Sequence, residues 1–367
     1  MNDKSPLDCK QNYKTLLCEK TAKLKQLFSN VTIPEISVFE SPEIHFRMRA
    51  EFRIWHTGDE LNYVMFKKGE KRTPVNIYEF PNASITISQV MSPLLEAIKE
   101  HETLSHKLFE IDFLSTTTGK LLVSLIYHKQ LDADWEVAAN ELQAKFGFAL
   151  VGRARKQKIV LEQDFVIEEM LVDNCLYHYQ QVENSFTQPN AYICQKMLSW
   201  AAEHTINSKG DLLELYCGNG NFTLPLSKNF DNVLATEVSK TSVKSANYNI
   251  ALNKINNVKV VRLSSEELTQ ALNKTREFRR LAEINLENYQ FSAVFVDPPR
   301  SGLDNETLQF ISQFNTIIYI SCNPSSLIEN IQKLDQHAIE RIALFDQFPF
   351  TDHIECGVIL KSIKSNE

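Results

Sequence analysis

The chain has few cysteines, and they do not lie in the spacings that metal sites require. Seven occur in 367 residues, an odd number without a Cys-x-x-Cys pair, at positions 9, 18, 175, 194, 217, 322 and 356. Zinc and iron–sulfur sites need clustered thiols, and disulfide frameworks need even sets of cysteines. We therefore expect no metal, no iron–sulfur cluster and no disulfide framework. Each cysteine is then a small core residue or a free thiol.

Long apolar runs are also missing from the sequence. No stretch approaches the ~20 consecutive apolar residues of a membrane-spanning helix. Residues 1–6 lack the basic and apolar segments of a signal peptide. We expect a monomeric protein of the cytoplasm without a membrane partner.

Positive charge is not in excess. The chain has 39 lysines and arginines against 46 aspartates and glutamates, a net charge of −7, which argues against a protein that coats nucleic acid indiscriminately. Local recognition stays open, because alternation in residues 45–56 places Arg47, Arg49 and Arg53 on one strand face. Arginines in line on a sheet suit phosphates or stacked bases. The opposite face is apolar and carries Phe46, Met48, Ala50, Phe52 and Ile54.

Two periodicities divide the chain, whose length and 43% hydrophobic content suit about two domains. Residues 1–180 mix strands with a few helices, which indicates an α+β domain on an antiparallel sheet. We expect helix 10–29 to pack on the other domain. The other expected elements are helices 89–101 and 133–146 and strands 46–56, 61–67, 107–115, 120–128, 148–153 and 157–162.

From about residue 190, strands and helices alternate regularly. This pattern predicts a doubly wound, Rossmann-like α/β domain in residues 181–367, with ligands at the carboxyl ends of its strands. The expected strands are 211–216, 232–237, 257–262, 292–296, 315–321, 339–345 and 354–362. The expected helices are 190–207, one from about 221, 239–253, 265–286, 304–313 and 324–334.

The turn after strand 211–216 carries the signal for a cofactor. Gly218 and Gly220 let the backbone approach a ligand, but Tyr216 occupies the place of the first glycine of a dinucleotide-binding pattern. Glu237 ends the next strand, where a carboxylate accepts hydrogen bonds from ribose hydroxyls. The pattern favours a nucleoside cofactor without pyrophosphate, which S-adenosylmethionine fits.

Two later strand ends are unusually rigid. Strand 292–296 runs into Asp297-Pro298-Pro299, which on the plainer interpretation is a strand stop and a turn, but two prolines after a charged residue also form a rigid platform. Strand 315–321 runs into Cys322-Asn323-Pro324. Asn323 is a good N-cap and Pro324 a good first helical residue, so we expect a helix N-terminus that lowers the pKa of Cys322.

A carboxylate near the C-terminus completes a candidate catalytic pair. Glu355 as a base near neutral pH needs its pKa raised by burial, while a thiol in the same fold suggests covalent chemistry on a pyrimidine. Two rivals adjoin it. Cys356 should point into the packing, because neighbouring strand residues face opposite ways. His353 shares the face of Glu355 and has a suitable pKa; we favour Glu355.

Several motifs together resemble those of the S-adenosylmethionine-dependent RNA uracil-5-methyltransferases, and over nearly the whole chain. They are Gln188-Pro-Asn, the turn from Glu214 to Phe222, Asp297-Pro-Pro-Arg-Ser-Gly, Ser-Cys322-Asn-Pro, Asp346-Gln-Phe-Pro and Glu355-Cys-Gly-Val. The first half shares Phe46-Arg-Met-Arg-Ala-Glu-Phe-Arg and the segment 106–112. Relatives that modify ribosomal RNA often carry an extra β-barrel and a four-cysteine cluster, so the resemblance favours the members that make ribothymidine in the T-loop of tRNA.

The resemblance implies roles for individual positions. It assigns S-adenosylmethionine to Gln188, Tyr216, Asn221, Glu237 and Asp297, the nucleophile to Cys322 and the proton acceptor to Glu355. It also implies the order of events: Cys322 attacks C6 of uracil, the methyl group is transferred to C5, the C5 proton is removed, and the thiolate leaves. From the residues themselves, Phe109, Arg49 and Arg53 are candidates to stack on or bind RNA.

The sequence leaves three alternatives open. The same chemistry on ribosomal RNA or tmRNA competes most closely. An amino-group methyltransferase of the Asp-Pro-Pro type needs no cysteine and normally has an aromatic residue after the prolines, where this chain has Arg300. A tRNA-binding or folding factor is the alternative from another class, and intact Cys322 and Glu355 argue against it as the sole role.

Overall fold

The computed structural model describes residues 6–58, 60–66 and 73–363, with side chains from residue 12 onward. The chain divides into two compact units, each of which we describe by itself. The larger unit comprises Met1–Glu43, Met170–Tyr179 and Tyr192–Glu367, and the smaller unit comprises Ile44–Glu169 and Gln180–Ala191. A functional boundary at residue 180 stays a prediction, since the compact units interleave along the sequence.

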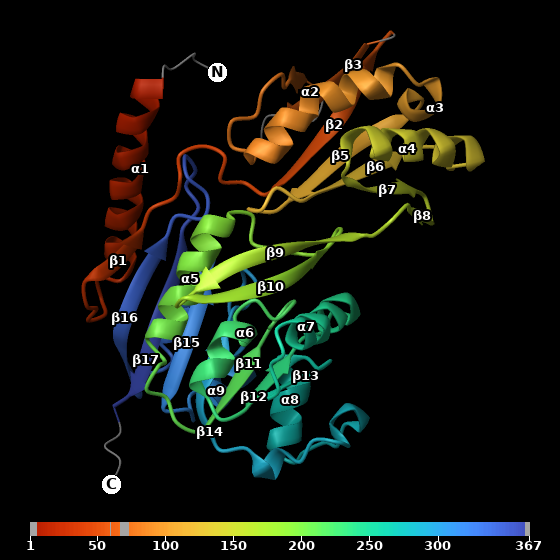
Figure 1. The fold of residues 1–367 in the computed structure, drawn as a ribbon. Helices are drawn as coiled ribbons and strands as arrows, with labels where there is room; N and C mark the ends of the chain where they lie inside the picture. Colours follow the sequence, from red (N-terminus) through yellow and green to blue (C-terminus); the bar gives the residue numbers. More distant parts are fainter. Residues whose placement is uncertain (1–5, 59, 67–72, 364–367) are drawn as a thin grey trace. The chain divides into compact units, whose positions relative to one another are not determined.

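The larger unit is built on a sheet that, within the described residues, has eight strands (Figure 1). Their order is β1 (Ile36–Phe39), β16 (His337–Phe345), β17 (Glu355–Ser362), β15 (Thr316–Ser321), β14 (Phe291–Val296), β11 (Asp211–Leu215), β12 (Val233–Thr236) and β13 (Val258–Val261). Neighbours run parallel, except that β17 is antiparallel to both β15 and β16. The predicted Rossmann-like class is confirmed.

Helices of the larger unit supply apolar side chains to the core around this sheet. They are α1 (Pro6–Leu27), α5 (Ala191–Glu203), α6 (Thr223–Leu226), α7 (Lys240–Leu252), α8 (Ser265–Leu272), α9 (Asn305–Ile311) and α10 (Pro324–Ile331). Leu17 and Leu24 of α1 share one buried cluster with strand residues such as Ile317. The N-terminal helix therefore packs in the unit that holds the C-terminal sheet, as expected.

The smaller unit has a mixed sheet of seven strands among the described residues. The order is β4 (Pro74–Asn76), β3 (Glu60–Phe66), β2 (Arg49–Thr57), β5 (Leu108–Ser115), β6 (Leu121–Tyr127), β7 (Ala149–Ala154) and β8 (Gln157–Val160). All neighbours are antiparallel except β6 and β7. The helices are α2 (Ile85–Lys99), α3 (Glu102–Ser105) and α4 (Ala133–Phe146). The face predicted to be apolar, from Phe46 to Ile54, is buried.

Three features differ from the elements expected from sequence. The predicted helix 265–286 ends at Leu272, and the chain continues in short 3-10 turns at Arg279–Leu281 and Leu286–Asn288. The hairpin of β9 (Phe165–Val172) and β10 (Cys175–Val182) was not predicted, nor was β1. β1 has four residues, too few for a clear alternation of apolar and polar side chains. Among the described residues the structure contains no helix with the length and apolarity of a membrane span.

Candidate active site

Three reactive side chains lie at one edge of the large sheet. Asp297 directly follows β14, Cys322 follows β15, and Glu355 begins β17. Strands β14 and β15 run parallel with Val296 opposite Tyr319, while β15 and β17 run antiparallel with Ser321 opposite Cys356. The register therefore brings Cys322, which follows Ser321, and Glu355, which precedes Cys356, to the same end of two neighbouring strands. The sheet joins residues that are far apart in sequence.

The start of α10 fixes the chain around Cys322. The side chain of Asn323 caps this helix by accepting a hydrogen bond from the Ser325 amide at 3.2 Å, and Pro324 is its first residue. This part of the prediction is confirmed. The Asn323 side chain also donates to the Arg300 carbonyl at 2.9 Å, and the Ser326 hydroxyl donates to the same oxygen at 3.2 Å. The segment after Asp297 is thus fastened to the helix that follows Cys322.

The prediction that the helix N-terminus lowers the pKa of Cys322 is wrong. The thiol is half-buried, and its pKa is raised above the ordinary value, first by burial and then by the carboxylates of Glu355 and Asp297. Arg300 lowers the pKa but does not outweigh these effects. Burial and the two neighbouring carboxylates raise the pKa, because both favour the neutral thiol over the anion.

Glu355 is buried, and its pKa is raised well above the ordinary value by burial and by Asp297, with Arg300 opposing the change. Asp297 shares this environment, and burial raises its pKa to about 7. The nearby charge of Asp297 makes ionisation of Glu355 less favourable, because like charges repel each other. The burial that a base near neutral pH requires is therefore present at Glu355.

The two rivals of Glu355 and Cys322 have other surroundings. Cys356 is fully buried in the core, as predicted, and its thiol lies 3.6 Å from the Ser321 carbonyl oxygen. His353 is exposed and lies before β17 begins. Its backbone amide donates to the Thr351 hydroxyl at 3.2 Å, and its ring lies 5.5 Å from the Phe348 ring.

A pocket of about 420 Å³ lies at the carboxyl ends of β11, β12 and β13 and includes Tyr216 and Glu237 in its wall. The amides of Gly218 and Ser239 donate to the Glu237 carboxylate at 3.1 and 2.7 Å. A carboxylate has about four acceptor positions, so capacity remains for ribose hydroxyls. Gly218 has φ +57, and no heavy atom of the described residues lies within 4 Å of the position that a Cβ would take. These residues fit a nucleoside at this turn.

The other residues assigned to the cofactor have different surroundings. The Asn221 side-chain amide nitrogen lies 3.3 Å from the Cys194 thiol, and the Asn221 backbone carbonyl accepts a hydrogen bond from the Tyr179 hydroxyl at 3.0 Å. Gln188 belongs to the smaller unit, whereas Tyr216, Asn221, Glu237 and Asp297 belong to the larger unit. A role for Gln188 at the cofactor stays a prediction.

The candidate RNA-binding residues lie on the smaller unit. The guanidinium of Arg53 lies 3.8 Å from the centre of the Phe109 ring, which stacks on His128 at 3.9 Å. Arg53 also pairs with Glu110. Arg49 is less exposed, donates to the Ser185 carbonyl at 2.6 Å and lies 3.4 Å from Glu51. Arg53 and Phe109 thus present a stack, while Arg49 also holds the backbone near residue 185.

Three residues to which the sequence gave no role at the site belong to these sites. Arg300 acts electrostatically on both Cys322 and Glu355. Ser265 shares a hydrogen bond of 2.8 Å with the Tyr216 hydroxyl, and His128 extends the Phe109 stack. Ser265 had a detectable signal, since the capping box from Ser264 to Glu267 starts a helix directly after a predicted strand. Local patterns contain no such signal for the other two.

The chain is similar to known proteins over nearly its whole length. Residues 12–363 match the family model described as tRNA (Uracil-5-)-methyltransferase. The tRNA/tmRNA (uracil-C(5))-methyltransferase of Cellvibrio japonicus is 54% identical over 350 residues, 95% of each chain. That of Psychromonas ingrahamii is 54% identical over 355 residues, 95% of this chain and 97% of its own. The fold matches the crystal structure of Pyrococcus abyssi tRNA (uracil-54, C5)-methyltransferase with S-adenosyl-L-homocysteine, at TM-score 0.72 and 22% identity over 95% of this chain and 83% of that one.

Proposed function

The chain belongs to the tRNA (uracil-5-)-methyltransferase family, and from this premise we propose that it methylates C5 of the T-loop uridine of tRNA through a covalent adduct of Cys322. The family uses S-adenosylmethionine, which supplies the methyl group. The observation that carries the proposal is the register of β15 and β17, which brings Cys322 and Glu355 to one edge beside Asp297. A thiol and a buried carboxyl at the same end of the sheet as a nucleoside pocket suit addition to one base and removal of a proton from it.

The chemistry begins at Cys322. C5 of uracil is a weak nucleophile, and a thiolate that adds to C6 moves the π electrons toward C5 and the O4 oxygen, giving an enolate. C5 would then form a bond to the methyl carbon as the bond from that carbon to the sulfonium sulfur breaks, and S-adenosylhomocysteine would be the leaving group. Arg300 favours this start, because its positive charge stabilises the thiolate.

Glu355 completes the reaction. Its carboxylate accepts the C5 proton, the electrons of that C–H bond re-form the C5–C6 double bond, and the Cys322 thiolate leaves. The buried position raises the pKa of Glu355, so the carboxylate is a stronger base than an exposed one. We assign S-adenosylmethionine to Tyr216, Asn221, Glu237 and Asp297, together with Gln188 of the smaller unit.

The smaller unit is proposed to bind the RNA. Arg53 and Phe109 form a stacked pair on its sheet, and Arg49 lies on the same strand as Arg53. Aromatic rings and guanidinium planes stack on unpaired bases. Moving a base out of its stack costs about a few kcal/mol of free energy, and this cost is lower for a loop base than for a duplex base. The relatives' names include tmRNA, which makes a T-arm of tmRNA the second candidate substrate.

The substrate assignment is tested with four RNAs and radioactive S-adenosylmethionine. They are a T-arm with uridine at position 54, the same arm with cytidine there, the corresponding arm of tmRNA, and a ribosomal RNA hairpin. We expect 5-methyluridine from the first arm, no product from the cytidine arm, and product from tmRNA if both substrates are used. Methylation of the ribosomal hairpin alone would overturn the assignment to tRNA.

A further inference from the structure

The loop between β16 and β17 leads directly into Glu355. Phe345, the last residue of β16, is paired in register with Glu355, the first residue of β17. Within the loop, the Thr351 hydroxyl donates to the Phe348 carbonyl at 2.7 Å, and the His353 amide donates to the Thr351 hydroxyl at 3.2 Å. The loop therefore joins two residues that are paired across β16 and β17, and its last residues lead into Glu355.

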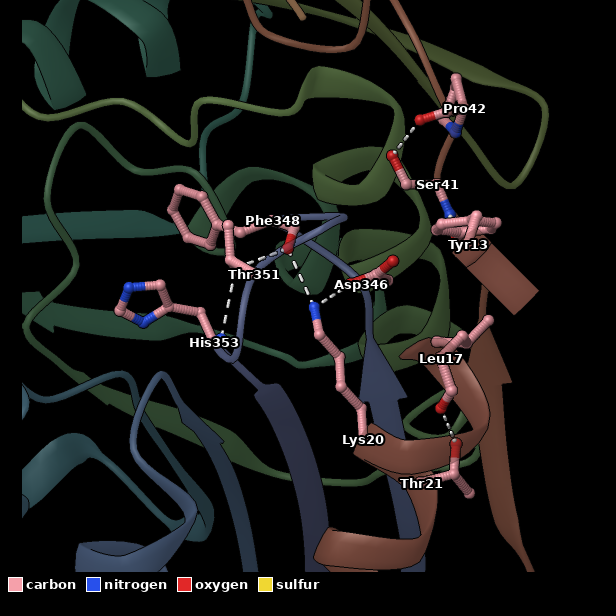
Figure 2. Close-up of polar contacts among 10 residues, drawn as sticks. All are labelled: Tyr13, Leu17, Lys20, Thr21, Ser41, Pro42, Asp346, Phe348, Thr351 and His353. Atoms are coloured by element: carbon pink, nitrogen blue, oxygen red, sulfur yellow. Dashed lines mark hydrogen bonds and ion pairs between the residues drawn. The ribbon is translucent and has the colours of Figure 1, made fainter. Parts of the chain in front are cut away.

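A buried lysine of the N-terminal helix holds the start of this loop. Figure 2 shows the Lys20 side chain extending from α1 toward Asp346 and Phe348. Its ammonium nitrogen lies 2.6 Å from Asp346 Oδ1 and 2.9 Å from the Phe348 carbonyl oxygen. Lys20 is 5% exposed and Asp346 is 1% exposed. A buried charge pair needs close geometry to offset its loss of hydration, so the pair tolerates little movement of the loop.

The helix that carries Lys20 is itself fixed. The Tyr13 hydroxyl accepts a hydrogen bond from the Ser41 amide at 2.8 Å (Figure 2). The Tyr13 ring lies 5.6 Å from the Phe350 ring of the same loop. The Asp346 amide donates to the Phe39 carbonyl of β1 at 3.0 Å. The N-terminal segment thus touches the loop before Glu355 through a side chain of α1, a ring of α1 and the backbone of β1.

We propose that Lys20 is a positioning residue for Glu355: through Asp346 and the Phe348 carbonyl it holds the loop in the conformation that places the carboxylate at the C5 proton. The inference rests on the proposed function, in which Glu355 removes that proton. Lys20 acts through the loop. Cys322 lies between β15 and α10, and the next residue, Asn323, is held by a different contact, its hydrogen bond to the Arg300 carbonyl.

Because Lys20 acts on the loop before Glu355 and not on Cys322, its loss should affect proton removal and leave the earlier steps unchanged. Without Lys20, Cys322 still adds to C6 and the methyl group is still transferred, but removal of the C5 proton slows. The methylated RNA then remains bound to Cys322, even when its target is an ordinary uridine. A variant that has merely lost folded protein would lose adduct and product in the same proportion.

The test compares four variants with the wild-type protein on ordinary T-arm RNA. Lys20→Met removes the ammonium group but leaves the buried charge of Asp346 unpaired. Lys20→Met/Asp346→Asn removes that charge as well, so the double variant can be measured if the single variant folds poorly. Lys14→Met is the matched control, because Lys14 lies on the same helix and pairs with Glu40 in solvent, with side chains 60% and 50% exposed. Glu355→Gln is the reference for blocked proton removal.

Product formation and adduct on a denaturing gel are measured in single-turnover experiments. In both Lys20 variants we expect turnover to fall on the order of a hundredfold while the rate of adduct formation stays within about threefold of wild type. The adduct should accumulate as in Glu355→Gln, and Lys14→Met should behave as wild type. Wild-type turnover in the double variant, or loss of adduct in proportion to product, overturns the role of Lys20. Absence of adduct in Glu355→Gln as well overturns the proton-acceptor assignment on which it rests.

Discussion

At the scale of single residues, the positive charge of Arg300 opposes the rise in pKa that neighbouring carboxyl groups cause at Cys322 and Glu355. Its backbone is fixed by Asn323 and Ser326, and its charge lowers the pKa of both Cys322 and Glu355. A cation near a thiol favours the thiolate, the reactive form. Arg300 therefore offsets part of the effect by which the site would keep the thiol neutral.

Replacement of Arg300 with methionine should slow adduct formation at neutral pH by roughly tenfold, because the pKa of Cys322 rises further. The loss should shrink as pH rises, since the thiolate then forms without the cation. Arg300→Lys, which keeps the charge, is the control. Rapid-quench measurement of adduct between pH 6.5 and 9.5 checks this, and an equal loss at every pH would contradict an electrostatic role.

The pH dependence of the reaction follows from the raised pKa values of Cys322 and Glu355. The thiol and the carboxyl are both active in their deprotonated forms. Because each folded-state pKa lies above its ordinary value, the active form becomes more populated as pH rises through neutrality. We expect kcat/KM for RNA to increase from pH 6 to pH 9. A flat profile, or one that falls over this range, would show that another group limits the reaction.

At the scale of elements, the segment after Asp297 depends on close packing against α10. Gly302 has φ +75, and a Cβ there would lie 2.7 Å from Asn330 Oδ1 and 3.1 Å from the Ser326 Cβ. The same Asn330 oxygen accepts hydrogen bonds from the Leu303 amide and the Tyr319 hydroxyl, each at 2.8 Å. A side chain at Gly302 would push this segment away from the helix that follows Cys322.

Gly302→Ala should therefore lower both thermal stability and the rate of adduct formation. Gly147→Ala is the matched control, since Gly147 has φ +71 and, among described residues, no heavy atom within 4 Å of a Cβ. In both variants the left-handed backbone at the new alanine lowers the free energy of unfolding by about 1 kcal/mol. At Gly302 the clash lowers it further. Calorimetry and single-turnover assays measure the two effects. Unchanged adduct formation in Gly302→Ala would show that the packing does not support the active site.

Elements with strong local signals could be predicted from sequence, whereas contacts between distant segments could not. The cap at Asn323, the following Pro324 and the buried face of β2 come from patterns within a few residues. The ion pair of Lys20 with Asp346 joins positions 326 residues apart. Its lysine is buried, against the usual preference of this residue for solvent. Strand order, which no local pattern encodes, brings such residues together.

At the scale of the whole molecule, the change of periodicity near residue 190 predicted two domains but not how they interleave. The N-terminal helix and β1 complete the larger unit, and residues 180–191, including Gln188, belong to the smaller one. The pKa of Cys322 was mispredicted for a related reason. The helix start was visible locally, but the carboxylates that raise the pKa come from Asp297, directly after β14, and from Glu355 in β17.

A net charge of −7 also limits how the molecule binds RNA. Recognition has to come from local groups such as the stack of Arg53, Phe109 and His128, because the overall charge repels phosphates. The covalent bond to Cys322 then retains a correctly placed base during methyl transfer. Covalent chemistry is thus the central feature of the proposed function.

The most direct measurement uses a T-arm RNA with 5-fluorouridine at the target, together with S-adenosylmethionine. Fluorine at C5 cannot be removed as a proton is, so the adduct should persist on a denaturing gel, and peptide mass spectrometry should place the RNA on Cys322. Cys322→Ala should form no adduct, whereas Cys356→Ala, which changes a core thiol, should still form it. Absence of adduct in the wild-type protein, or undiminished adduct in Cys322→Ala, would contradict the proposed mechanism.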